Sequence, residues 1–228
     1  MKMNKYQYVC ENYKKPKPIL FNTEMVRAIL EGRKTQTRRP IKGYGNNYHV
    51  NKLLGEWALS EEPEIVKIKK KDWLPRKFNK DKFILRWILQ TEVDDCLRFD
   101  IKLPYQPGDI LYVRETFYPC KHVIIDGEQQ YLYRATFEQP EKYPDFKPKW
   151  KPSIHMPKEA ARIFLRVTNV RVERLQDLLA IDVQKEGFEE RGEFEDSWDD
   201  TYLEKGYGWD KNPWVWVIEF ERVRENDD

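Results

Sequence analysis

The chain of 228 residues contains little cysteine or histidine and no long apolar run. Its three cysteines, Cys10, Cys96 and Cys120, lie far apart, and none belongs to a CxxC pair. An odd number of scattered cysteines fits a reduced cytosolic protein better than a disulfide scaffold or a zinc site. The sequence holds no cluster of His, Cys and Asp residues, so we expect neither a catalytic metal nor another cofactor.

An excess of one charge is also missing. The 41 basic and 39 acidic side chains leave a net charge of +2, although charged residues make up 35% of the chain. A uniformly basic nucleic-acid-binding surface is thereby excluded, and any such surface must come from local clustering. Residues 1–17 lack the apolar core of a signal peptide, and no stretch approaches the ~20 apolar residues of a membrane span. We therefore expect a soluble, cytoplasmic protein without a membrane partner, and we favour a monomer.

Aromatic residues are abundant, at 14% of the chain with eight Trp and thirteen Tyr. The simpler explanation is a mostly β core that carries aromatic side chains on its sheets. Alternatively, some of these rings line a pocket or stack on bases. Trp150, Trp214 and Trp216 are candidates for both roles.

The most patterned stretch joins a short helix to a basic segment. One helical face carries four apolar residues: Met25, Val26, Ile29 and Leu30. Asn22 or Thr23 can cap the start of this helix, and Gly32 can end it. Residues 31–40 then hold four cations and two threonines. Such a segment can bind phosphate, activate a hydroxyl group or form a solvated turn.

Residues 34–39 can continue as a strand. Pro40 either ends this strand or places it at the edge of a sheet. The alternation of a strand puts its residues on two faces, namely Lys34, Gln36 and Arg38 against Thr35, Thr37 and Arg39. Lys34 and Thr37 therefore point to opposite faces of a regular strand. They can act together only if the chain bends or bulges between them.

The rest of the chain predicts more strands than helices. We expect strands at 19–21, 83–89, 110–117, 162–175 and 214–221, a hairpin at 120–133 around Asp126-Gly127, a proline-rich loop or lid at 140–157, and helices at 177–185 and 197–205. The long strand at 162–175 should be bent or bulged. Few helices and several non-local strands predict an α+β fold with a barrel-like core.

Three charged residues stand out on these elements. Arg114 and Glu115 interrupt an apolar strand, where charges are costly unless they are paired or belong to a site. Glu186 lies at the edge of the buried helix face just before Gly187, the helix stop. The C-terminal end of a helix is unfavourable for an anion such as Glu186.

Five segments, taken in their order along the chain, resemble the ASCH domain family. They are GRKTQTRR at 32–39, PGDILYVRE at 107–115, the strand at 162–175, KEG at 185–187 and NPWVWVIEF at 212–220. The segment PSIHMP at 152–157 adds similarity to the branch encoded by bacteriophages and prophages. The resemblance implies a PUA-like fold, a small β-barrel with flanking helices, and an association with RNA and modified bases. We expect one domain over residues 1–228, with insertions at about 43–103 and 118–157.

The resemblance also implies a site. One branch of the family consists of amidohydrolases that remove the acetyl group from N4-acetylcytidine, and their motif has a lysine, a threonine three residues later and a glutamate near the end of a later helix. Lys34, Thr37 and Glu186 occupy these positions, and Arg39 matches a neighbouring arginine. Thr37 is then the nucleophile, Lys34 its base and Glu186 a proton carrier or orienting group.

Other functions stay open at this point. A non-catalytic module could bind RNA or a modified base, a ribonuclease could act without metal, and a phage accessory protein could bind a host factor. For the nucleoside or RNA ligand we expect contacts from six further residues: Arg33, Arg38, Arg39, Arg114, Glu115 and His155.

Overall fold

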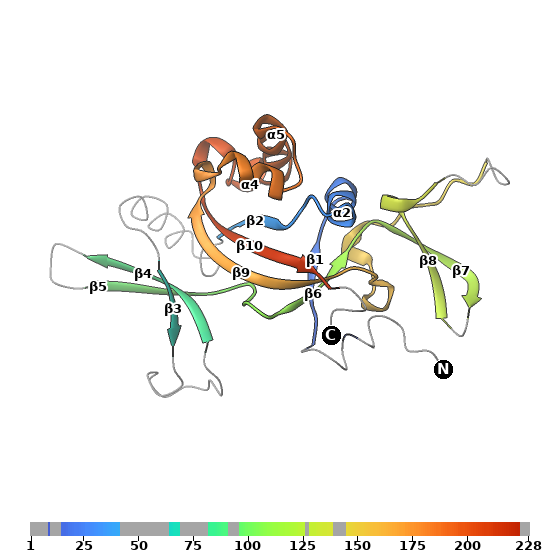
Figure 1. The fold of residues 1–228 in the computed structure, drawn as a ribbon, viewed down its shortest axis with the longest axis horizontal. Helices are drawn as coiled ribbons and strands as arrows, with labels where there is room; N and C mark the ends of the chain where they lie inside the picture. Colours follow the sequence, from blue (N-terminus) through green and yellow to red (C-terminus); the bar gives the residue numbers. More distant parts are fainter. Residues whose placement is uncertain are drawn as a thin grey trace.

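The computed structural model of the protein describes residues 9, 15–41, 64–68, 82–90, 96–125, 128–138 and 145–223. Its architecture is α+β with few helices, as predicted (Figure 1). The strands are β1 (Lys17–Leu20), β2 (Gln36–Pro40), β3 (Glu64–Ile68), β4 (Lys82–Gln90), β5 (Cys96–Lys102), β6 (Ile110–Arg114), β7 (Phe117–Ile125), β8 (Glu128–Tyr133), β9 (Phe164–Arg174) and β10 (Trp214–Arg222). The helices are α2 (Thr23–Leu30), α4 (Ala180–Lys185) and α5 (Arg191–Tyr202).

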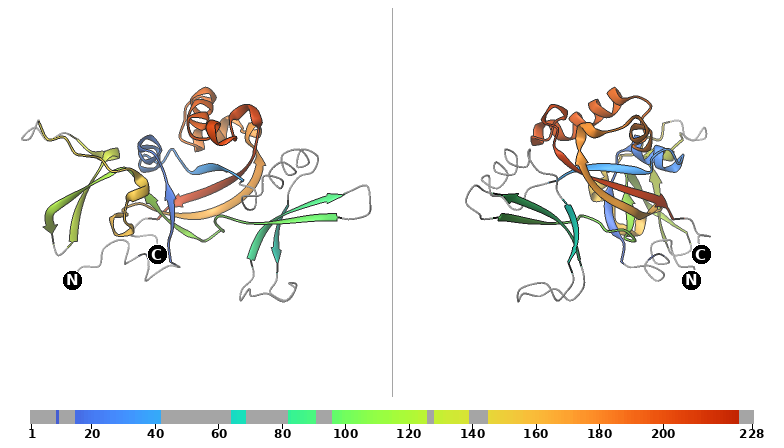
Figure 2. Two further views of the ribbon diagram at one scale, coloured as in Figure 1. Left: turned by 180° about the vertical axis from the view of Figure 1, so that it is seen from behind. Right: turned by 60° about the vertical axis from the view of Figure 1, so that its left-hand side comes forward.

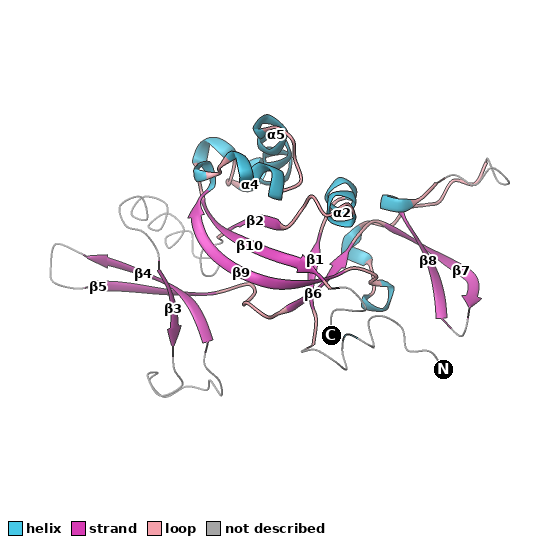
Figure 3. Ribbon diagram, in the orientation of Figure 1, coloured by secondary structure: helices cyan, strands magenta, loops and turns pink. Residues whose placement is uncertain are grey.

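The central sheet has five strands in the order β1-β6-β9-β10-β2. Strands β1 and β6 run parallel, and the other neighbours are antiparallel. Each of β1 and β2 pairs on one side only, so among the described strands the sheet stays open and no closed barrel forms. Figure 3 shows the long strands β9 and β10 curving beneath the helices.

The predicted irregularity in β9 is confirmed. Val167 pairs with Phe220 and Asn169 pairs with Glu219, which leaves Thr168 as an extra residue opposite β10. A bulge of this kind bends the strand and increases its twist. It accounts for the curvature of the sheet at this point.

The two faces of the central sheet bury different clusters. Trp216, Ile218 and Phe220 alternate along β10 on the face that packs with α2. Val215 and Val217 lie on the other face, against α4 and α5. This alternation is the reason why the segment forms a strand, because each face then buries apolar surface worth roughly 1.5–3 kcal/mol per large side chain.

Helix α2 forms as predicted. The Asn22 side chain accepts a hydrogen bond from the Met25 backbone N–H at 2.8 Å, and Gly32 takes a left-handed φ of +80° just past the helix end. Both capping interactions place the basic segment at a fixed point after the helix.

Two small sheets lie outside the central one. Strands β3, β4 and β5 form an antiparallel sheet within the segment 43–103, which includes the predicted strand 83–89. Strands β7 and β8 form the predicted hairpin. Figure 2 shows these two sheets at opposite ends of the central sheet. The expected turn at Asp126-Gly127 lies outside the described residues.

Three predicted boundaries were wrong. The strand expected at 110–117 ends at Arg114, because Phe117 begins β7 and exchanges backbone hydrogen bonds with Lys151. The helix expected at 177–185 begins at Ala180, after a 3₁₀ turn over Leu175–Asp177.

The helix expected at 197–205 begins earlier, at Arg191, where the Glu193 carboxylate accepts the free N–H groups of Glu189 and Glu190. It ends in a 3₁₀ turn over Leu203–Lys205. No helix in the described part of the chain combines the length and apolar character that crossing a membrane requires.

Candidate functional site

The basic segment meets the end of α4 before β2 begins. The Lys34 N–H donates to the Ala28 carbonyl at 3.1 Å, and the Thr35 N–H donates to the Lys185 carbonyl at 2.9 Å. The Thr35 carbonyl accepts from Phe220 of β10 at 2.8 Å. These backbone bonds fix residues 34 and 35 against α2, α4 and β10 at once.

Gly187 makes this close approach possible. Its φ is +92°, and a Cβ atom at this position would lie 2.9 Å from the Ala28 Cβ and 3.2 Å from the Lys34 Cβ. Only glycine combines the left-handed conformation with the missing side chain. The glycine that ends α4 therefore also lets the end of this helix pack directly against Lys34.

Lys34 is buried, with 2% of its surface exposed. Its Nζ donates to Glu186 Oε2 at 2.8 Å and to the Glu186 carbonyl at 2.7 Å. Burial lowers the pKa of the Lys34 ammonium; the charge and hydrogen bond of Glu186 oppose this shift, while Arg39 and Arg38 add to it. The net effect is a pKa below the usual lysine value, which makes the neutral amine more accessible.

Glu186 has a cation on each carboxylate oxygen. Oε2 accepts from Lys34, and Oε1 accepts from Arg38 Nη1 at 3.2 Å. The side chain is only 2% exposed although it lies at the C-terminal end of α4. The two cations supply the compensation that a buried anion at this end of a helix requires.

Arg38 extends this pair into a buried ionic cluster. Its Nη2 contacts Asp182 Oδ2 at 3.3 Å and also forms an ion pair with Glu173. Arg171 contacts Glu173 at 3.1 Å and Asp182 at 3.5 Å, and it pairs with Glu219 as well. The cluster thus links β2, β9, β10 and α4.

The electrostatics of Asp182 follow from this cluster. Burial alone would raise the pKa of Asp182, but the charges of Arg38 and Arg171 and the hydrogen bonds from Leu179 and Gln36 outweigh it. The pKa is therefore held below the usual aspartate value. The carboxylate stays ionised and keeps Arg38 in place.

Two buried polar atoms of the cluster have no partner within the described structure: Gln36 Oε1 and Arg38 Nε. Gln36 and Arg38 lie on the same face of β2, as the alternation predicted, and Gln36 Nε2 donates to the Asp182 carbonyl and Oδ1 at 3.2 Å each. The expectation that Arg38 meets a ligand does not match this environment, because its side chain is fully buried among carboxylates.

Thr37 lies on the opposite face of β2. It pairs with Ile218 of β10 and is 1% exposed. No hydrogen bond joins its hydroxyl group to another residue in the part of the chain that the structure describes.

The Phe21 ring connects Lys34 to the Thr37 face. Lys34 Nζ lies 5.7 Å from the ring centroid, and the Arg39 guanidinium lies 5.5 Å from the same centroid. Thr37 and Arg39 share a face because they are two residues apart on β2. Since β2 begins only at Gln36, Lys34 lies outside the strand alternation, and its Nζ bonds to Glu186 while lying near the Phe21 ring.

Arg39 spans the gap between the two edge strands. Its Nη2 donates to the Leu20 carbonyl of β1 at 2.9 Å, and its Nη1 lies 3.4 Å from the Tyr202 hydroxyl. Arg33, by contrast, is exposed and bonds to Glu31 and, at 2.8 Å, to the Gly187 carbonyl. Arg39 thus lies beside the site, and Arg33 lies at its rim.

A hollow of about 350 Å³ opens next to Lys34. Its walls are formed by Ile29, Gly32, Lys34, Thr35, Leu165, Phe220, Glu221 and Arg222. Thr37 and Glu186 are not among them, so this hollow borders the Lys34 site without containing it.

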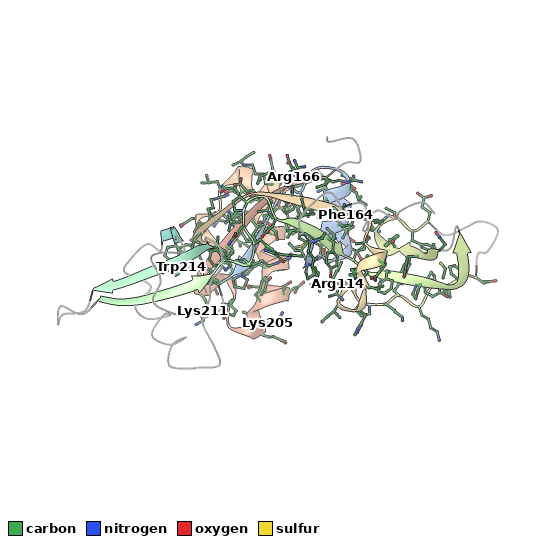
Figure 4. All side chains as sticks on the ribbon, turned by 90° about the horizontal axis from the view of Figure 1, so that it is seen from below. Arg114, Phe164, Arg166, Lys205, Lys211 and Trp214 are labelled. Atoms are coloured by element: carbon green, nitrogen blue, oxygen red, sulfur yellow. The ribbon has the colours of Figure 1, made fainter. Side chains whose placement is uncertain are left out.

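The other expected ligand contacts lie elsewhere. Glu115 is buried and forms two 2.9 Å bonds with Arg162, and Arg114 donates to the carbonyls of Ile154 and Met156. Figure 4 labels Arg114. His155 is exposed in a 3₁₀ turn. These charges hold the loop at 152–157 and strand β6 together, and they do not join Lys34, Thr37 and Glu186.

The described residues contain no group of three or more His, Cys, Asp or Glu arranged to hold a metal ion. Sequence reasoning missed Glu173, Asp182 and Arg171, although the spacing of Asp182 and Glu186 on one helix face was a usable signal. Comparison of the chain with protein-family models, with curated proteins and with solved structures found no match.

Proposed function

We propose that the protein hydrolyses the amide of an N4-acylated cytidine, with Lys34, Thr37 and Glu186 as the catalytic groups. One observation carries this proposal. A buried lysine amine with a lowered pKa is held by a buried glutamate at 2.8 Å, just before the strand that carries the buried hydroxyl of Thr37. Perturbed, buried, paired groups of this kind are typical of catalytic sites.

The proposed reaction proceeds in two halves. The neutral amine of Lys34 removes the proton from the Thr37 hydroxyl. At the same time the Thr37 oxygen attacks the acyl carbonyl carbon, and a tetrahedral oxyanion forms. The C–N bond then breaks, the N4 nitrogen takes the proton from Lys34, and cytidine leaves. Water, deprotonated by the same amine, attacks the carbonyl carbon of the acyl-threonine ester. The bond from this carbon to the Thr37 oxygen then breaks, the protonated Lys34 amine returns its proton to that oxygen, and the carboxylic acid leaves.

Glu186 and Arg39 support these steps in different ways. Glu186 orients the Lys34 amine through its Oε2, and Arg38 holds the other oxygen so that the carboxylate cannot rotate away. Arg39 lies on the Thr37 face beside Phe21, where its charge can stabilise the developing oxyanion.

We also propose that the open five-stranded sheet corresponds to the barrel of PUA-like proteins. Its edges β1 and β2 approach each other closely enough for Arg39 of β2 to donate to Leu20 of β1. The motifs that resemble the ASCH family then fall on β2, β6, β9 and β10 and at the C-terminal end of α4.

Release of cytidine from N4-acetylcytidine, followed by chromatography, tests the proposal. Thr37→Val, Lys34→Met and Glu186→Gln should each lower kcat at least about 100-fold, since each removes a group used in the transition state. Thr201→Val makes the same substitution at an exposed threonine of α5 and should leave kcat unchanged. Equal activity of Thr37→Val and the parent protein would refute the assignment of the nucleophile.

The pH profile gives a second readout. Because the base must be neutral, kcat/KM should rise with pH through the pKa of Lys34, which lies below the usual value of 10.5. A rise that begins only near 10.5 would contradict the proposed role of the buried amine.

One observation favours a second candidate, binding without hydrolysis. Both oxygens of Glu186 are occupied by cations, an arrangement that also serves a purely structural ion cluster. Such a module would bind a modified base without releasing cytidine. A metal-independent ribonuclease would instead cleave RNA that is offered as the substrate without added metal.

A further inference from the structure

The β7–β8 hairpin carries a second surface with a different chemistry. Four aromatic rings form consecutive contacts, with centroid distances of 5.9 Å from Tyr118 to Phe146, 6.3 Å from Phe146 to Phe137 and 5.3 Å from Phe137 to Trp150. We call these four residues the aromatic ladder. Each member is only partly buried, so part of each ring remains accessible.

Lysines alternate with the ladder along residues 146–151. Phe146, Pro148 and Trp150 are half-buried, whereas the lysines between and after them are exposed: Lys147, Lys149 and Lys151. The segment is anchored because Lys151 and Phe117 exchange backbone hydrogen bonds at 2.7 and 3.1 Å. Three cations therefore stand in a row beside a row of rings.

These cations differ from most others in the described structure. Lys147, Lys149, Lys151 and the exposed Arg134 form no ion pair with any residue that the structure describes. Seven arginines elsewhere are paired with carboxylates: Arg27, Arg33, Arg38, Arg162, Arg166, Arg171 and Arg191. Four cations without an ion pair among the described residues therefore lie next to the aromatic ladder, and further such cations occur elsewhere, for example Lys205 and Lys211.

From this arrangement we infer that the aromatic ladder and its three lysines bind single-stranded RNA. Rows of cations contact the phosphates of a strand, and partly exposed rings stack on its unpaired bases. An acidic peptide would engage the lysines but leave the ring surfaces unused. A duplex would present phosphates while keeping its bases inside the stack.

The position of this surface deepens the proposed function, and in this respect alone it rests on that proposal. The 3₁₀ turn Arg134–Thr136, which lies between Tyr133 and the ladder residue Phe137, packs on α2, where Arg27 Nε donates to the Ala135 carbonyl at 3.1 Å. Helix α2 ends at the segment that delivers Lys34. A strand held on the ladder can therefore continue over α2 toward the catalytic site, which makes RNA the substrate rather than a free nucleoside.

Fluorescence anisotropy with a fluorescein-labelled oligouridine of about 15 nucleotides tests the inference on the full chain. The triple variant Lys147→Gln, Lys149→Gln, Lys151→Gln should bind at least about 10-fold more weakly at low salt, and the slope of log Kd against log salt should fall by about 2. Trp150→Ala should weaken binding by about 5- to 150-fold, whereas Trp150→Phe should retain most of it. The probe contains no acyl group, so a lack of amide hydrolysis leaves this test intact.

A matched control uses exposed lysines that lie away from the hairpin. Lys205→Gln with Lys211→Gln removes two exposed cations, both labelled in Figure 4 away from the hairpin, and should leave the affinity nearly unchanged. Unchanged binding by the triple variant would overturn the inference. Equal competition by duplex RNA or by polyglutamate would overturn it as well, because neither offers unpaired bases.

Discussion

The two cationic regions of this protein use charge in opposite ways. Around Glu186, the cations Lys34 and Arg38 are buried and each is paired with carboxylates. Beside the aromatic ladder, the lysines are exposed and form no ion pair with any residue that the structure describes. Buried pairing fixes side chains and shifts pKa values, whereas exposed charge stays mobile and responds to salt. The first arrangement suits chemistry at one point, and the second suits the capture of a long polyanion.

Replacement of Arg38 should lower the unfolding free energy more than any of the substitutions below. Arg38→Met leaves the buried carboxylates of Glu173, Asp182 and Glu186 short of a partner, which should cost roughly 3–5 kcal/mol of unfolding free energy. Urea denaturation measures the loss. Lys149→Met, the same change at an exposed lysine, should stay within about 0.5 kcal/mol, and similar losses for both variants would contradict the distinction between the two regions.

Asp182 should give the next largest effect. Asp182→Asn weakens its bonds to Arg38 and Gln36 and should cost about 1.5–3 kcal/mol at neutral pH. Because the folded pKa lies below the unfolded value of 3.8, this carboxylate stabilises the fold fully above 3.8 and less as pH falls through the lowered pKa. The parent and Asp182→Asn proteins should therefore converge in stability at acidic pH. Asp210→Asn, at an exposed position, should show no such convergence.

Substitutions at Gly187 and Gly32 distinguish the cost of backbone strain from the cost of a steric clash. Both have left-handed φ angles, +92° and +80°, but a Cβ atom would clash only at Gly187. Gly32→Ala should cost about 1–2 kcal/mol from the backbone conformation alone. Gly187→Ala should cost more and should also lower kcat, because it displaces Lys34. Equal stability of the two variants would show that α4 does not constrain Lys34.

The exposed pair of Arg33 and Glu31 should give the smallest effect. Arg33→Gln removes a surface ion pair and should change the unfolding free energy by less than about 1 kcal/mol. Thermal unfolding at low and high salt provides the measurement. A larger loss would mean that the bond from Arg33 to the Gly187 carbonyl also supports the site.

Local pattern predicted the elements around the site well. The cap at Asn22, the stops at Gly32 and Gly187, the alternation along β10 and the bulge in β9 all follow from short-range chemistry, and each is confirmed. The predicted ends of elements were wrong where a residue distant in the sequence determines them. Phe117 starts a new strand because Lys151, far along the chain, bonds to it.

The same limit applies to the site. The face shared by Gln36 and Arg38 could be predicted, but not that this face would meet Glu173 and Asp182, because this depends on how β2, β9 and α4 lie around β10. The basic segment therefore suggested a ligand-binding surface, whereas two of its four cations, Lys34 and Arg38, are buried beside carboxylates. The meeting of Lys34 and Glu186 is a fact of the fold, whereas their catalytic role stays a prediction.

The open central sheet has one further consequence, which concerns association between molecules. Unpaired strand edges are templates for pairing with another chain. Here β1 contains Pro18 and β2 ends at Pro40, and neither proline has an N–H to offer. On β1 the carbonyls of Pro18 and Leu20 already accept bonds from Tyr105 and Arg39. The two edges thus carry their own protection against strand addition, so the sheet can remain open without becoming a seed for aggregation.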